Sequence, residues 1–143
     1  MSKLKVFTDG ASRGNPGESG IGIVVTDEKD VILKKWNEYL GKATNNQAEY
    51  KAIIKSLEIL AQMLQGSSHT VEKIEFYADS ELIVKQLRNE YKIKNPELKL
   101  LHAEFTKKVR NLGIKYSISH VERALNKAAD KLANQAIDNK NSL

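Results

Sequence analysis

Residues 3–40, KLKVFTDGASRGNPGESGIGIVVTDEKDVILKKWNEYL, decide the fold of this chain. Apolar and polar side chains alternate over Lys3–Asp9, which predicts a half-buried strand. A turn-rich stretch, Gly10–Gly20, separates it from a second strand at Ile21–Thr26, and a polar turn leads into a third at Val31–Leu40. We therefore expect the chain to begin with an antiparallel meander of three strands.

Helical patterns and two more strands follow the meander. Thr44 and Gln47 form a capping-box pattern, and the helix that they open carries one continuous apolar stripe. The other predicted elements are a fourth strand at Lys73–Asp79, a short helix capped by Ser80, a helix opened by Asn95-Pro96, a fifth strand at Ile114–His120 and a last helix capped by Asn126. This order predicts an α/β fold, with a five-stranded mixed sheet (three antiparallel strands, then two parallel) flanked by helices.

The composition is that of one globular domain spanning residues 1–143. Of the chain, 41% is hydrophobic and 29% is charged, and no apolar run approaches the roughly 20 residues that span a bilayer. Cysteine is absent, which excludes disulfides, thiolate zinc sites and a cysteine nucleophile. The first residues run directly into a strand pattern without a secretory signal, so we expect a cytoplasmic protein.

The net charge of +5 is unevenly distributed. Basic side chains outnumber acidic ones between residues 85 and 115, with Lys85, Arg88, Lys92 and Lys94 close together. A locally basic surface favours binding of polyanions through counterion release, but solvated helix surfaces carry lysines too. Charge alone leaves both interpretations open.

Four acids occupy positions where a structural role is hard to supply. Asp9 and Asp79 each end a predicted strand, although Asp is a poor strand former. If these strands are adjacent and parallel, both acids lie at the carboxyl edge of the sheet, where ligands gather in α/β proteins. Glu49 and Asp130 are placed to reach that edge from covering helices.

Converging carboxylates repel one another at neutral pH unless cations neutralise them. Because clusters of His or Cys are absent, the natural ions are Mg²⁺ or Mn²⁺. The alternative for each acid taken alone is a helix cap, a turn residue or a surface charge.

Four motifs resemble the type 1 ribonuclease H family. They are T-D-G-A-S-x-G-N-P-G from Thr8, T-N-N-Q-A-E-Y from Thr44, A-D-S from Ala78 and H-V-x-R-x-x-N-x-x-A-D-x-L-A from His120. They occur in the family's order and cover about residues 3–138.

The resemblance implies an endoribonuclease that cuts the RNA strand of an RNA/DNA hybrid, leaving 5′-phosphate and 3′-hydroxyl ends. It implies that Asp9, Glu49, Asp79 and Asp130 bind two Mg²⁺ ions, with Mn²⁺ as a substitute, and that His120 assists catalysis. Its substrate-binding set would be Gly10, Ala11, Asn15, Thr44, Asn45, Asn46, Ser80 and Asn126. Of these, Thr44 and Asn126 resemble residues of a pocket for a DNA-strand phosphate, and helix capping is the competing interpretation for both.

The chain also departs from many family members. Only about ten residues separate Leu87 from Glu97, which leaves no room for the basic protrusion that grips the substrate in several relatives. Lys85, Arg88, Lys92 and Lys94 are candidates to replace it. We expect a monomer with no obligate protein partner and no membrane association.

Three alternative hypotheses stay open. They are activity on RNA/RNA duplexes or RNA–DNA junctions, non-catalytic binding of nucleic acid on the same scaffold, and an α/β protein whose acids are incidental. A complete set of four acids argues against the last two.

Overall fold

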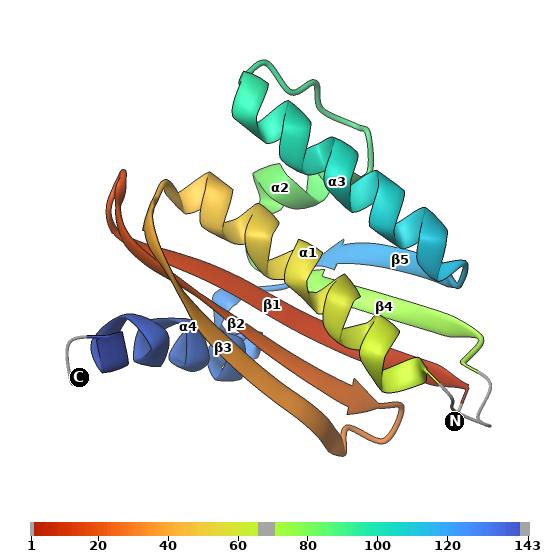
Figure 1. The fold of residues 1–143 in the computed structure, drawn as a ribbon. Helices are drawn as coiled ribbons and strands as arrows, with labels where there is room; N and C mark the ends of the chain where they lie inside the picture. Colours follow the sequence, from red (N-terminus) through yellow and green to blue (C-terminus); the bar gives the residue numbers. More distant parts are fainter. Residues whose placement is uncertain (1, 66–70, 141–143) are drawn as a thin grey trace.

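A computed structural model describes residues 2–65 and 71–140 of the chain (Figure 1). In chain order the elements are β1 (Lys3–Gly14), β2 (Gly17–Asp27), β3 (Ile32–Ala43), α1 (Asn45–Leu64), β4 (Lys73–Ala78), α2 (Glu81–Leu87), α3 (Pro96–Leu112), β5 (Lys115–His120), the short 3-10 helix η1 (Arg123–Leu125) and α4 (Lys127–Lys140).

The strands form one sheet in the order β3-β2-β1-β4-β5. Neighbours are antiparallel from β1 to β3, whereas β4 runs parallel to β1 and β5 runs parallel to β4. Helix α1 packs on β1 and β2 and against α3, and α4 covers the opposite face of β1, β2 and β3 (Figure 1). The predicted fold class is therefore confirmed.

The principal core lies between the sheet and α1. Even-numbered residues of β1, such as Leu4 and Val6, point into it and are almost fully buried. The apolar stripe of α1, including Ile53, Leu57 and Leu60, packs against them. Burial contributes about 1.5–3 kcal/mol for each large apolar side chain, so this layer is the main stabilising contact of α1.

The prediction of a turn-rich stretch at Gly10–Gly20 is wrong. Strands β1 and β2 extend through it as a continuous ladder, and only Asn15 and Pro16 lie between them. Gly14 and Gly17 flank this short turn, whereas Gly10 and, farther along β2, Gly22 permit close packing of helices on the sheet. A Cβ on Gly10 would lie 2.3 Å from the backbone carbon of Ala48 in α1, and one on Gly22 would lie 2.1 Å from the backbone oxygen of Ala129 in α4.

This packing makes Gly22 a sensitive position. Gly22→Ala is expected to lower the free energy of unfolding by about 3 kcal/mol or more, because the methyl group meets backbone atoms that cannot move independently. Gly41→Ala is the matched control, since nothing lies within 4 Å of its Cβ and only its φ of +75° costs about 1 kcal/mol. Urea unfolding of both variants measures the difference; equal losses would contradict the packing explanation.

Two further predictions concern the connection between α2 and α3 and the presence of membrane-spanning helices. The chain passes from α2 to α3 through residues 88–95 without another helix, so the basic protrusion is absent, as predicted. In residues 2–65 and 71–140, no helix combines the length and apolar character that crossing a bilayer requires.

Candidate functional site

Asp9 and Asp79 meet where the parallel pairing of β1 and β4 stops. The last pair in that register joins Thr8 to Ala78, and each aspartate is the next residue of the chain. The predicted fourth strand included Asp79, whereas β4 ends one residue earlier, at Ala78, and β1 continues past Asp9 in its antiparallel pairing with β2. The carboxyl edge of the parallel strands therefore brings together two acids that are 70 residues apart in the chain.

Glu49 and Asp130 reach the same place from opposite faces of the sheet. Glu49 lies in the first turns of α1, next to Ala48, whose backbone packs directly over Gly10. Asp130 lies in the first turn of α4, next to Ala129, whose backbone oxygen packs over Gly22. The close helix approaches that these glycines permit thus set the distance of both acids from Asp9.

The four acids line one pocket of about 460 Å³. One carboxylate oxygen each of Asp9, Glu49 and Asp79 lies within 4.8 Å of the others, and Asp130 lines the pocket outside this tight group. The structure therefore brings together all four predicted acids.

The arrangement is electrostatically unfavourable without a counter-charge. Burial, then the charge of Asp79, then contact with Asp130 raise the pKa of Asp9 to about 8. Burial, followed by the charges of Asp9 and Asp79, raises the pKa of Glu49 well above its ordinary value. Both shifts mean that the folded protein disfavours the charged forms of these two carboxyls.

The donor set fits a hard divalent cation. Only oxygen ligands surround the centre, and among the described residues the Oε2 atom of Glu49 is buried without a hydrogen-bond partner. A buried carboxylate oxygen without a donor is costly, and coordination to a cation would satisfy it. The Asp9, Glu49 and Asp79 group is thus able to hold a metal ion.

Other predicted residues also line this pocket. They are Gly10, Ala11, Asn45, Asn46 and Ser80, and the Ser80 hydroxyl caps α2 by accepting a hydrogen bond from the backbone of Ile83, as predicted. Two lining residues, Ser12 and Arg123, were not among the predicted site residues. Their only sequence signal was membership of the quoted motifs, T-D-G-A-S for Ser12 and H-V-x-R for Arg123.

Thr44 and Asn15 organise the start of α1 outside the pocket lining. Thr44 forms the predicted capping box with Gln47. The Oδ1 atom of Asn15 accepts a hydrogen bond of 3.1 Å from the backbone N–H of Asn45, which ties the β1–β2 hairpin to α1. Both residues therefore have structural roles that support the neighbouring Asn45 and Asn46.

Asn126 departs from its predicted roles. Its side chain is 1% exposed, and it does not line the acidic pocket, so a direct phosphate contact lacks access. Asn126 directly precedes α4, as predicted, and its backbone oxygen accepts the first hydrogen bond of that helix from Asp130. Its Oδ1 atom, however, has no hydrogen-bond partner in the described part of the chain, so the side-chain cap expected from the sequence does not form. The side chain instead turns toward the sheet, where Nδ2 donates to the backbone oxygen of Thr8 and to Asp79.

His120 ends β5 and is exposed. It pairs in register with Ala78, one residue before Asp79, yet it is not one of the described residues that line the acidic pocket. The next residue, Val121, donates a backbone hydrogen bond of 3.0 Å to Ala78. His120 thus lies at the margin of the site.

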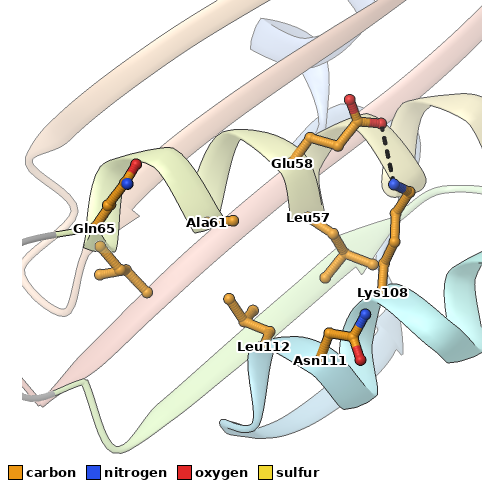
Figure 2. Close-up of a pocket in the computed structure, with 8 residues that line it drawn as sticks. Leu57, Glu58, Ala61, Gln65, Lys108, Asn111 and Leu112 are labelled. Atoms are coloured by element: carbon orange, nitrogen blue, oxygen red, sulfur yellow. Dashed lines mark ion pairs between the residues drawn. The ribbon is translucent and has the colours of Figure 1, made fainter.

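A second hollow lies between α1 and α3 and, unlike the acidic pocket, is lined by apolar side chains and an ion pair (Figure 2). Leu57, Ala61 and Leu112 line it, and Glu58 pairs with Lys108 at 3.9 Å at its side. No cluster of acids lies there among the described residues, so the group able to hold a metal ion is that of the first pocket.

The fold and the acids together define a ribonuclease H-like nuclease scaffold. Residues 7–136 match the family described as reverse transcriptase-like. The chain is 37% identical over 136 residues to a protein of Halobacterium salinarum named ribonuclease HI, covering 95% of this chain and 65% of that protein. It spans 36% of a similar bifunctional protein of Mycobacterium tuberculosis, so it matches only part of these curated relatives.

Solved structures match nearly the whole length of the chain. An RNase H1 isolated from compost superimposes with a TM-score of 0.91 at 43% identity, covering 98% of this chain and 99% of that one. An RNase H1 solved in complex with an RNA/DNA hybrid gives a TM-score of 0.90 at 40% identity, covering 96% and 98%. The chain belongs to the type 1 ribonuclease H family.

Proposed function

We propose that this protein is an endoribonuclease that hydrolyses the RNA strand of RNA/DNA hybrids with two divalent metal ions. The observation that carries the proposal is the convergence of Asp9, Glu49, Asp79 and Asp130 in one open pocket. Acids this close together repel one another when ionised unless cations neutralise them. A phosphodiester is the kind of anionic substrate that metal ions bind and polarise.

The four acids would hold the ions, and the rest of the pocket would orient the substrate. When bound, two such ions would supply the charge that activates the attacking water and stabilises the leaving 3′-oxygen. Asp9, Glu49 and Asp79 form the tight group that would grip one cation, and Asp130 stands beside it to help bind a second. The products would carry 5′-phosphate and 3′-hydroxyl ends.

The hybrid is the proposed substrate for two reasons. The relative solved with an RNA/DNA hybrid shares this fold at 40% identity. In addition, Gly10 and Ala11 expose backbone in the pocket, beside Asn45 and Asn46, where polar groups can sense 2′-hydroxyls that distinguish RNA from DNA. Catalysis on RNA/RNA duplexes or at RNA–DNA junctions is the second candidate, since the same contacts engage any A-like RNA strand.

Cleavage of labelled duplexes tests this proposal. RNA/DNA, RNA/RNA and DNA/DNA duplexes are each incubated with Mg²⁺, Mn²⁺ or a chelator. We expect cleavage of the RNA strand of the hybrid with either metal and none with chelator. Binding without cleavage in every condition would instead identify a non-catalytic nucleic-acid-binding module.

Arg123 and His120 are expected to contribute to hybrid cleavage to different extents. Within the described ranges, Arg123 is the one basic side chain lining the acidic pocket, so it is placed to contact a substrate phosphate. Arg123→Ala should lower kcat/KM about 10- to 100-fold, and His120→Ala should slow turnover less because His120 lies at the margin. Steady-state kinetics on the hybrid measure both; a larger loss in His120→Ala would reverse this assignment.

The cellular compartment and the oligomeric state complete the proposed function. We propose that it acts as a cytoplasmic monomer without an obligate protein partner. Its lack of cysteine is compatible with a reducing compartment. Light scattering of the purified protein tests the oligomeric state.

A further inference from the structure

Asn126 contacts three segments that meet at the acidic site. Its Nδ2 atom donates to the backbone oxygen of Thr8 at 2.9 Å, directly before Asp9. The same atom donates to Oδ2 of Asp79 at 3.3 Å. Its backbone oxygen accepts a hydrogen bond of 3.1 Å from the N–H of Asp130. A single buried residue therefore links β1, the end of β4 and the start of α4.

The hydrogen-bond partners of the Asn126 side chain determine which way its amide group points. Thr8 offers a carbonyl oxygen and Asp79 a carboxylate oxygen, so both need a donor, which only the NH₂ group provides. Turning the amide over would set oxygen against oxygen at both contacts. The Oδ1 atom stays buried without a partner among residues 2–65 and 71–140, which is a cost that the two donated bonds must offset.

We propose that Asn126 is a positioning residue that holds the Asp79 carboxylate in the direction required for cation binding. Asp79 follows the end of its strand and faces the repelling carboxylates of Asp9 and Glu49. A donor that is itself anchored to Thr8 keeps Asp79 from turning away from them. This inference rests on the proposed metal-dependent function and concerns the support of one of its ligands.

Metal affinity measured in Asn126→Ala tests the inference. Removal of a group that orients a metal ligand typically costs 10- to 100-fold in metal affinity or activity. We expect the Kd for Mn²⁺ and Mg²⁺, measured by calorimetry, to rise about 10-fold or more, and kcat to fall with little change in KM for the hybrid. A merely structural role would lower Tm and leave these Kd values unchanged.

Asn37→Ala is the matched control. The Nδ2 atom of Asn37 also donates to a backbone oxygen, that of Leu132 at 3.1 Å, and also ties the sheet to α4, but it touches none of the four acids. It should reduce stability without altering metal affinity. An unchanged Kd in Asn126→Ala, or an equal rise in Asn37→Ala, would overturn the proposal.

Asn126→Asp covers the case in which the alanine variant fails to fold. It retains the shape of the side chain but replaces the donor by an oxygen that repels Asp79 and the carbonyl of Thr8. Its kcat at saturating Mg²⁺ should fall at least 10-fold, and a wild-type kcat would refute the inference. Wild-type protein that binds metal but cleaves no hybrid would refute the proposed function alone, because the Kd comparison still reports on Asn126.

Discussion

Asp9→Asn is expected to lower hybrid cleavage by about 10³-fold or more at saturating Mg²⁺. The substitution preserves the shape of the side chain and removes the charge at the centre of the acidic group. An amide oxygen binds a divalent cation far less strongly than a carboxylate does. Since metal-bound charge stabilisation is the main proposed catalytic contribution, little activity should remain. Asp79→Asn should behave alike.

Initial rates on a hybrid with a labelled RNA strand measure this loss. Circular dichroism should show an unchanged fold, because Asp9→Asn removes a buried charge from a repelling group. Asp138→Asn is the control, since Asp138 lies on α4 with 61% exposure and pairs with Arg13 away from the pocket. Residual activity of Asp9→Asn within about tenfold of wild type would refute the catalytic assignment.

The acids were predictable from the sequence because their signals are local. An aspartate that directly follows an alternating strand is unusual on propensity alone, and parallel strands bring their carboxyl ends together. Glu49 comes soon after a clear helix start at Thr44, and this spacing alone places it in the first turns of α1. The topology was equally constrained, because two parallel crossovers leave few alternatives.

The errors occurred where long-range contacts decide the conformation. Gly10 was predicted to open a turn-rich stretch, yet it is a strand residue over which helix α1 packs. Asn126 before a helix predicts a cap, yet its side chain contacts Asp79, 47 residues earlier in the chain. Arg123 lies on the short 3-10 helix η1, which is too short for a periodic pattern, and its place in the H-V-x-R motif did not by itself assign it to the pocket.

The raised pKa values of Asp9 and Glu49 predict an unusual pH dependence of stability in the metal-free protein. A carboxyl whose pKa is higher folded than unfolded holds more protons in the folded state, so the free energy of unfolding falls as pH rises. For Asp9 this window runs from its ordinary value of 3.8 to about 8. Acids with lowered pKa values, such as Glu75, act in the opposite direction and only below about their ordinary value of 4.5.

We expect the metal-free protein to lose about 2 kcal/mol of stability between about pH 5 and pH 8.5. Urea unfolding in chelator at several pH values measures the loss. Asp9→Asn should flatten much of the slope, whereas Glu75→Gln should leave it unchanged. Groups outside the acidic pocket that titrate in this range are common to the proteins compared and cancel. Mg²⁺ should restore stability most at high pH, where the carboxylates are ionised and bind it. A metal-free stability that rises with pH in wild type but not in Asp9→Asn would mean that the carboxylates do not repel one another, and the reason for cation binding at this pocket would be lost.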